Sequence, residues 1–209
     1  MKIIKPSYEI LTPISDGGIG ELKRIEQAAR ICYESEHRIT EDGESAKILV
    51  KNLIKNEHYA PIETSQLSVK FVCDRGVSHE LVRHRLSSFC QSSTRYCNYS
   101  NDVFGNEITV IEPFFYNKRP LEYETWKISC EMAEKAYFEL LRCGSTPQEA
   151  RTVLPNSLAT KIVVTANYRE WLHIFKLRCA PDAHPQMREI MIPLRNKMKE
   201  LIPIIFTQC

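Results

Sequence analysis

Side chains suited to binding an anion are concentrated in residues 79–96 of this 209-residue chain. The stretch holds Arg83, Arg85 and Arg95, together with two histidines, four serines and a threonine. Five basic residues against two acidic ones give residues 70–95 a local charge of +3, whereas the whole chain carries +2. A concentrated charge in a nearly neutral protein indicates a site for a compact anion. Arginine suits a phosphate because its planar guanidinium donates two parallel hydrogen bonds.

Two other interpretations of this stretch stay open from its composition alone. A solvated arginine face on a surface helix has the same residues, since runs of charge usually lie on the surface. A nucleic-acid-binding module would use the Arg- and Ser-rich residues 83–95, with Tyr96 and Tyr99 as stacking platforms. The small net charge, and the lack of a basic stripe that continues along the sequence, argue against nucleic acid as a partner.

Nucleophilic catalysis within the stretch is a weaker hypothesis. Ser93 has no His–Asp arrangement around it in the sequence, and arginine is a poor general base, so we expect this serine to bind an anion. Cys90 and Cys97 flank the basic residues without a dedicated base beside either. The eight cysteines form no C-x-x-C pair and show no zinc-like spacing with histidine, so we expect reduced thiols and no metal site.

The composition is that of an ordinary globular protein, with 43% hydrophobic and 26% charged residues. No apolar run reaches the ~18 residues that a membrane-spanning helix needs. The first residues lack the features of a signal peptide, so we expect a cytoplasmic protein. Repeats, low-complexity segments and linkers are not apparent in the sequence, and residues 1–209 are expected to form a single α+β domain.

Two predicted strands and two predicted helices would position the anion-binding stretch. Alternating apolar residues favour a strand over residues 66–73, followed by a helix over 75–86 and a Ser-rich loop. A second strand is predicted over residues 158–166, ended by Asn167. An amphipathic helix is predicted over residues 168–179. Its inward-facing residues are Trp171, Ile174, Phe175 and Leu177.

The remaining segments favour helices, with one strand at the start of the chain and a short β segment over residues 108–112. Residues 2–12 favour a strand, which Pro6 pushes toward a sheet edge. Ser45 is expected to cap a helix over residues 46–56, with Ile48 and Ile54 among its core-facing residues. The other predicted helices cover residues 19–33, 120–143, 147–154 (with Arg151) and 186–206.

The chain contains the motif Arg83-His84-Arg85, then seven residues and Ser93, followed by Arg95-Tyr96. This motif resembles the signature of the flavin-dependent thymidylate synthases. Four further blocks follow the order of that family: H-x-x-P-x-E (His58, Pro61, Glu63), EARTVLP around Arg151, T-x-N ending at Asn167, and LR ending at Arg178. Together with the signature, they cover roughly residues 20–195.

The resemblance implies reductive methylation of dUMP to dTMP. Methylenetetrahydrofolate would donate the carbon, reduced FAD the hydride, and NADPH would reduce the flavin again. It also implies a central, mostly antiparallel sheet flanked by helices, and a homotetramer whose active sites combine residues from several chains. Nucleic acids and membranes are not implied as partners. A Rossmann site for FAD or NADPH is not expected, because no G-x-G-x-x-G follows a predicted strand.

The resemblance also implies residue roles. Arg178 would face the uracil, where its charge stabilises the negative charge that develops as hydride arrives at C6. The residues implied to bind the substrate are Glu80, Arg83, Gln91, Ser92, Ser93, Thr94, Arg95, Arg151 and Arg178. Those implied to bind the cofactor are His58, Arg83, His84, Arg85, Gln91, Asn167, Tyr168, Arg169 and His173. This chain departs from the family pattern at Glu80, Gln91 and His173, where many members have Gln, Glu and Asn.

Overall fold

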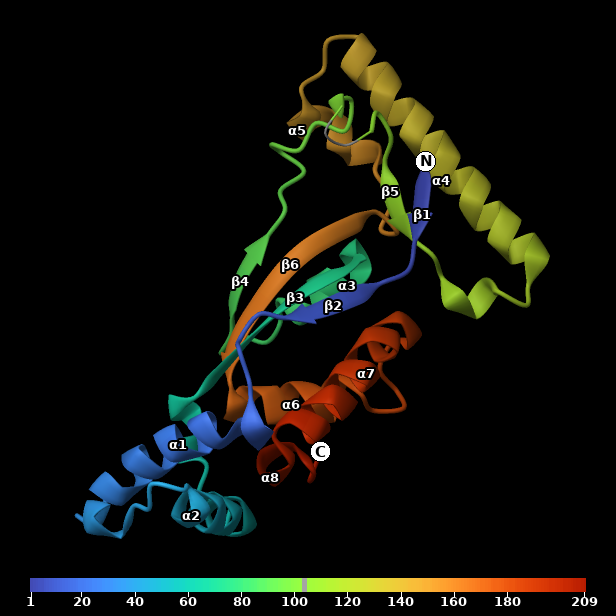
Figure 1. Cartoon of the computed structure of the whole chain (residues 1–209). Helices are drawn as coiled ribbons and strands as arrows, with labels where there is room; N and C mark the ends of the chain where they lie inside the picture. Colours follow the sequence, from blue (N-terminus) through green and yellow to red (C-terminus); the bar gives the residue numbers. More distant parts are fainter. Residues whose placement is uncertain (103–104) are drawn as a thin grey trace. The chain divides into compact units, whose positions relative to one another are not determined.

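The chain has an α+β fold with a mostly antiparallel sheet, as predicted. A computed structural model describes residues 1–102 and 105–209 (Figure 1). The strands are β1 (Lys2–Ile4), β2 (Ser7–Ile10), β3 (Gln66–Asp74), β4 (Ser88–Gln91), β5 (Thr109–Ile111) and β6 (Ala159–Asn167). The α-helices are α1 (Ile19–Ile31), α2 (Glu44–Lys55), α3 (Arg75–Leu81), α4 (Pro120–Arg142), α5 (Pro147–Ala150), α6 (Tyr168–Arg178), α7 (Pro185–Leu201) and α8 (Pro203–Phe206).

The strands form two sheets. The larger sheet has the order β2-β3-β6-β4, and the smaller one pairs β1 with β5 in parallel, with Lys2 opposite Thr109. The prediction of one strand over residues 2–12 is therefore wrong. The chain breaks at Pro6, because proline has no N–H to continue a ladder, and the two halves join different sheets.

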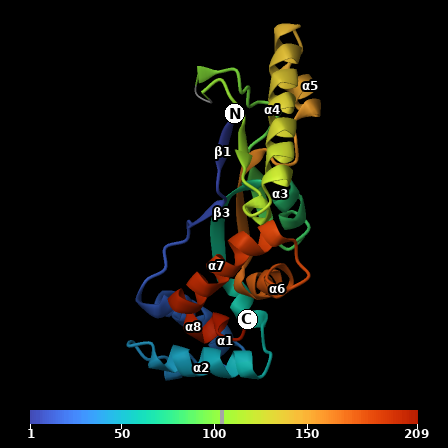
Figure 2. The ribbon, with the colours of Figure 1, turned by 90° about the vertical axis from the view of Figure 1, so that its right-hand side faces the viewer.

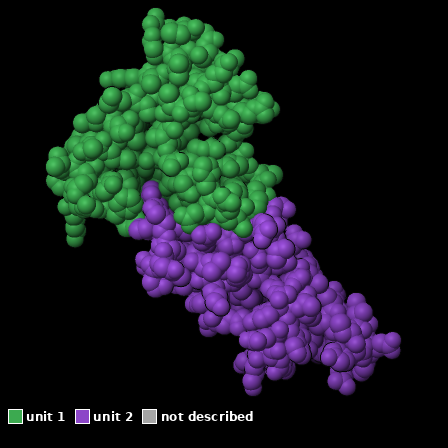
Figure 3. Space-filling view, turned by 180° about the vertical axis from the view of Figure 1, so that it is seen from behind, with its two compact units in different colours: residues 1–8, 70–83, 89–163 green, residues 9–69, 84–88, 164–209 purple. Residues whose placement is uncertain are grey.

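The chain divides into two compact units, coloured in Figure 3. Unit 1 comprises residues 1–8, 70–83 and 89–163, and unit 2 comprises residues 9–69, 84–88 and 164–209. Each of the four strands in the larger sheet contributes residues to both units. None of the helices within residues 1–102 and 105–209 has the length and apolarity needed to cross a bilayer.

In unit 1, helix α4 covers the small β1–β5 sheet (Figures 1 and 2). Their common core consists of Ile108, Val110, Cys130 and Leu158, all buried, and the partly buried Trp126 packs against them. The indole Nε1 of Trp126 donates a hydrogen bond of 2.8 Å to the Ser157 hydroxyl, which satisfies its polar edge. The helix predicted over residues 120–143 is thus confirmed, because its apolar stripe has a sheet to cover.

In unit 2, the core is built around the aromatic face of α6. Trp171 and Phe175 are fully buried, with ring centroids 5.5 Å apart, and Phe206 of α8 packs edge-on against Phe175. The Trp171 Nε1 donates to the Leu67 carbonyl at 3.0 Å and so attaches the helix to β3. Leu177, predicted to face inward, is 45% exposed, because the apolar stripe that α6 buries ends at Phe175.

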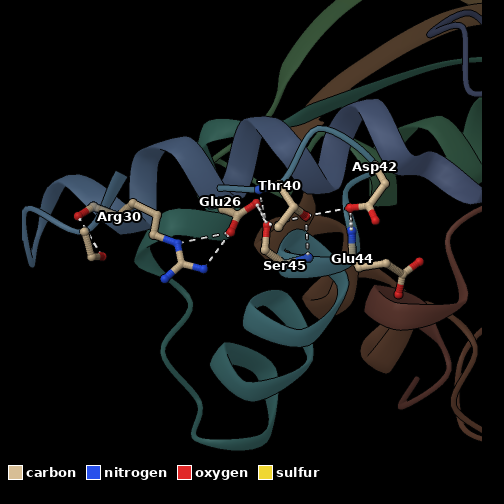
Figure 4. A network of polar contacts seen from close by, with 7 residues as sticks. Glu26, Arg30, Thr40, Asp42, Glu44 and Ser45 are labelled. Carbon is tan, nitrogen blue, oxygen red and sulfur yellow. Dashed lines mark hydrogen bonds and ion pairs between the residues drawn. The ribbon is translucent and has the colours of Figure 1, made fainter. Parts of the chain in front are cut away.

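A second part of unit 2 is held by a buried glutamate. Glu26 of α1 is fully buried, and its Oε1 accepts hydrogen bonds from Arg30 Nε (3.0 Å) and Nη2 (2.8 Å) (Figure 4). The Ser45 hydroxyl donates to Glu26 Oε2 at 2.9 Å. Ser45 is therefore not the helix cap that was predicted. Helix α2 begins at Glu44, two residues earlier than predicted, after Gly43, whose φ of 80° lies in the left-handed region.

Two predictions near the anion-binding stretch also need correction. Helix α3 ends at Leu81, not Leu86. Its start is capped by Asp74, whose Oδ1 accepts a hydrogen bond from Val77 N at 2.7 Å. Residues 88–91, expected within a Ser-rich loop, form strand β4.

A further correction concerns α2, where Ile48, predicted to face the core, is 63% exposed.

Candidate active site

The first group of predicted site residues lies in unit 2 around α6. Asn167 caps this helix, and its Oδ1 accepts a hydrogen bond of 2.8 Å from Glu170 N. Glu170 lies in the first turn and Arg178 at the last residue, positions at which the helix dipole favours an anion and a cation respectively. We call the set His84, Glu170, His173 and Arg178 the α6 cluster.

The centre of the α6 cluster is a buried histidine. His84 is 5% exposed and Glu170 is 7% exposed. The Arg178 Nε donates a hydrogen bond of 2.9 Å to His84 Nε2. On the other side of the ring, His84 Nδ1 lies 3.3 Å from Glu170 Oε1. The His173 ring is edge-on to His84, with centroids 6.0 Å apart.

The environment of His84 keeps its imidazole neutral. Burial, followed by the nearby Arg178 and His173, lowers the pKa of His84 from 6.5 to about 4. Burial raises the pKa of Glu170, and His173 acts in the opposite direction. A neutral imidazole has one nitrogen that donates and one that accepts. Because Arg178 has no acceptor to offer, the lone pair must lie on Nε2, facing Arg178, and the proton on Nδ1, facing Glu170.

Two cavities in unit 2 adjoin the α6 cluster. One, of about 470 Å³, is lined by Glu63, Leu86, Asn167, Arg169, Glu170 and His173. Arg169 and His173 also line a cavity of about 720 Å³ that includes Tyr59, Lys176 and Arg195. Arg169 is held by an ion pair of 2.5 Å with Glu63 and lies 5.8 Å from the centre of the Tyr59 ring. Both cavities fall in the size range of small-molecule sites.

The second group of predicted site residues lies in unit 1, in residues 91–95, which begin at the last residue of β4. We call these residues the anion loop. Ser92 fixes it to β6: Ser92 N donates to the Lys161 carbonyl at 2.9 Å, and Lys161 N donates to Ser92 Oγ at 3.1 Å. The Gln91 amide donates to the hydroxyls of Ser78 (3.0 Å) and Thr160 (3.1 Å). These contacts hold the start of the loop in place.

Beyond Ser92 the anion loop turns, and two arginines lie at its surface: Arg95 within the loop and Arg151 beside it. The Ser93 carbonyl accepts from Tyr96 N at 3.2 Å, and Ser93 Oγ accepts from Arg95 N at 3.3 Å. The Arg151 Nη1 donates to the buried Thr94 hydroxyl at 3.4 Å, and Arg151 and Arg95 are both exposed. The arrangement presents two guanidiniums and two hydroxyls, a donor set suited to a phosphate.

Comparison with known proteins identifies the family. Residues 19–204 match the family described as thymidylate synthase complementing protein. A flavin-dependent thymidylate synthase of Pyrococcus abyssi is 34% identical over 194 residues, covering 88% of this chain and 78% of that protein. Another, from Geobacter sulfurreducens, is 30% identical over 184 residues, covering 86% and 78%. The chain belongs to the flavin-dependent thymidylate synthase family.

Solved structures agree with this family's fold. The UMP/dUMP methylase PolB from Streptomyces cacaoi, in a crystal structure with 5-Br dUMP, superposes with a TM-score of 0.79 over 99% of this chain and 96% of PolB. The sequence identity is 20%, and the likeness at this level shows the fold alone. The resemblance inferred from the motifs is confirmed by the match over residues 19–204.

The predicted site residues are divided between the two units. Unit 1 holds the implied substrate residues Glu80, Arg83, Gln91, Ser92, Ser93, Thr94, Arg95 and Arg151. Unit 2 holds Arg178 and most of the implied cofactor residues, namely His58, His84, Arg85, Asn167, Tyr168, Arg169 and His173, whereas the implied cofactor residues Arg83 and Gln91 lie in unit 1. Among the residues in unit 2, the Tyr168 side chain is fully buried in the core against Phe206, while His58 and Arg85 are exposed.

Sequence reasoning missed three residues of these sets. Glu170 is the buried partner of His84, and the spacing of Asn167, Glu170 and His173 at intervals of three on one helix could have indicated it. Ser78 and Thr160 hold the Gln91 amide from α3 and β6. For these two no local signal exists, because the contacts join residues 13 and 69 positions apart.

His84, Glu170 and His173 also have ligand atoms within 4.8 Å of one another, as in a metal site. A metal at His84 Nδ1 would require a lone pair there and a proton on Nε2. That proton would point at the Arg178 N–H 2.9 Å away, and the guanidinium charge would lie beside the ion. The geometry of these residues therefore fits a hydrogen-bonded cluster. It does not fit a set of metal ligands well.

Proposed function

We propose that this protein converts dUMP to dTMP by reductive methylation, with methylenetetrahydrofolate as carbon donor. The anion loop carries the proposal, because it supplies the donors that a nucleotide monophosphate needs. Ser93 and Arg95 bind the phosphate, and Arg151 approaches the same turn through Thr94. Membership of the flavin-dependent thymidylate synthase family, and the binding of 5-Br dUMP by the structurally similar PolB, support this assignment.

Arg178 acts on the pyrimidine ring in this proposal. Its guanidinium is permanently charged, and it stabilises the negative charge that develops on the ring when hydride arrives at C6. Arg178 Nε donates to His84 Nε2, and in this proposal the terminal nitrogens of the guanidinium face the pyrimidine ring. Because those donors are fixed before the reaction, no reorganisation is needed as the charge develops.

The residues around α6 have the chemistry to hold FAD. The diphosphate of FAD needs cations, and Arg85 and Arg169 are exposed guanidiniums in unit 2. The cavity of about 470 Å³ adds the Asn167 amide and the His173 imidazole, which suit the polar edges of a flavin. When bound, FAD supplies the hydride and is reduced again by NADPH. The proposed cofactor set is completed by His58, Arg83, His84, Gln91 and Tyr168.

The protein is proposed to work as a cytoplasmic homotetramer with shared active sites, each chain forming one domain. Support for assembly comes from α4, where Leu121, Ile128 and Met132 are 77%, 53% and 65% exposed on one helical face. Support for a reducing compartment comes from the cysteines, all eight of which lie in the described residues and are free. Light scattering should give the mass of four 24.2 kDa chains.

The test of the proposed function is a reconstituted assay. Purified protein incubated with FAD should become yellow, and it should convert dUMP to dTMP only when methylenetetrahydrofolate and NADPH are both supplied. A protein that does not take up FAD and makes no dTMP under these conditions contradicts the proposal.

A further inference from the structure

Glu170 has no role among the predicted site residues, yet it is one of the most enclosed carboxylates in unit 2. It is 7% exposed, and its Oε1 lies 3.3 Å from His84 Nδ1. An ionised carboxylate in such a position needs a partner, because burial of a charge is costly. That partner is the Nδ1–H of His84.

The contact between His84 and Arg178 shows which nitrogen of the His84 ring carries the proton. Arg178 Nε donates to His84 Nε2 at 2.9 Å, which is possible only when Nε2 carries a lone pair. In the other neutral tautomer, Nε2–H and Arg178 Nε–H would be two donors facing each other. In the doubly protonated ring the same clash occurs and two positive charges are adjacent. One of three protonation states is therefore compatible with the observed arrangement.

The carboxylate selects that state. Glu170 accepts from Nδ1–H, and so stabilises the tautomer whose lone pair is on Nε2. The groups that face His84 are Glu170, His173 and Arg178, all from α6. His173 does not replace Glu170 in this role, since its ring is edge-on with the centroid 6.0 Å away.

We propose that Glu170 is a positioning residue that acts on Arg178 through His84. The carboxylate holds the imidazole proton on Nδ1, the Nε2 lone pair binds Arg178 Nε, and the plane of the guanidinium is thereby fixed. With Nε anchored, the four N–H groups on the terminal nitrogens point away from His84 in a set direction. The consequence for turnover rests on the proposed function, but the tautomer and the orientation of Arg178 do not.

The direct test is the tautomer of His84, read by nitrogen-15 NMR of the full-length protein labelled at histidine. The His84→Gln variant assigns the signal among the six histidines. The wild-type signal should be that of the Nδ1–H form throughout pH 6 to 8. In Glu170→Gln, which keeps the shape and removes the charge, the signal should shift toward the Nε2–H form. A wild-type Nε2–H tautomer, or no change in Glu170→Gln, overturns the proposal.

The functional test separates positioning from a structural role. Glu170→Gln should lower kcat about tenfold while the bound FAD per chain stays unchanged, because Arg178 is misplaced and not lost. In an Arg178→Lys background, which has no Nε donor for His84, the same change should lower kcat less than about twofold. Equal losses in both backgrounds would mean that Glu170 does not act through Arg178.

A matched control and an activity-independent readout keep the outcomes distinct. Glu200→Gln removes an exposed carboxylate of α7 in the same unit and should leave kcat and the His84 signal unchanged. If the wild-type protein makes no dTMP, the proposed function fails, and the NMR result alone decides the role of Glu170. If dTMP forms but His84 is in the Nε2–H form, the positioning role fails and the function stands.

Discussion

The α6 cluster and the anion loop handle their charges in opposite ways. In the α6 cluster, the buried His84 lies between a carboxylate and a guanidinium, so each group has a partner within the chain. In the anion loop, Arg95 lies 5.4 Å from the centre of the Tyr96 ring and Arg151 donates to Thr94. Neither arginine forms an ion pair with any residue in the described part of the chain. Both are exposed.

This difference indicates two kinds of work. A buried, internally paired cluster keeps its geometry without a ligand, as catalysis by fixed dipoles and charges requires. Exposed arginines beside hydroxyls obtain their partner from outside, as the binding of an anion requires. Changes in the α6 cluster should therefore reduce turnover, and changes in the anion loop should reduce affinity.

The largest effect is expected from Arg178→Ala. It removes the proposed stabilising charge and leaves His84 Nε2 without its donor. We expect kcat to fall by about 10²- to 10³-fold, the range for loss of one preorganised donor. Steady-state rates of dTMP formation measure it, with the flavin absorbance confirming that FAD is still bound. A kcat within threefold of wild type would remove Arg178 from the chemistry.

Arg95→Ala should have a smaller effect of a different kind. Loss of one charge-assisted hydrogen bond to a phosphate is worth about 1.5–3 kcal/mol, so KM for dUMP should rise about 10- to 100-fold. The value of kcat at saturating dUMP should change much less. Arg142→Ala, an exposed arginine of α4 paired with Glu139, is the matched control. A fall in kcat without a rise in KM would contradict the binding role.

The protonation of His84 predicts a pH dependence that the anion loop lacks. The folded pKa of about 4 lies below the ordinary 6.5, so between these values the unfolded chain binds a proton that the folded chain does not. The free energy of unfolding should therefore fall as pH drops through this window, by about 2 kcal/mol at pH 5. The raised pKa of Glu170 opposes part of this fall.

Urea unfolding of wild type and His84→Gln at pH 7 and pH 5 measures this contribution as a difference between the two proteins. The wild type should lose more stability on acidification than the variant. Equal losses would show that His84 is not held neutral in the folded protein.

The smallest effect is expected from Cys90→Ala. Cys90 is exposed on β4, next to the anion loop, and is a free thiol. Because the proposed chemistry uses no protein nucleophile there, kcat and KM should stay within about twofold of wild type. Abolition of turnover by this change alone would mean that a thiol nucleophile has been overlooked.

The sequence predicted those parts of the fold that local patterns determine. The start of α6 after Asn167 follows from the end of the preceding strand and an apolar stripe, and β3 follows from alternating apolar residues. Strand β4 was missed because Ser88–Gln91 has weak strand propensity and forms by pairing with β6, about 70 residues away in sequence. The end of α3 was missed because the apolar spacing continues to Leu86, which is 76% exposed.

The site was predicted to the extent that motifs name residues. The resemblance pointed to His84 and Arg178, but their contact joins residues 94 positions apart and is visible only in the fold. The same holds for Glu170, whose importance comes from burial and not from its spacing alone. Motifs thus indicated which residues belong to the site. The tautomer of His84 and the two kinds of charge environment could be inferred only from the three-dimensional structure.

The most direct test of the account is tritium release from dUMP labelled at C5, with FAD, NADPH and methylenetetrahydrofolate present. Wild-type protein should release tritium in step with dTMP formation. Arg178→Ala should release it about 10²- to 10³-fold more slowly, and Arg95→Ala should approach the wild-type rate once dUMP is saturating. Wild-type protein that contains FAD but releases no tritium, or an Arg178→Ala variant that matches it in rate, would contradict the account.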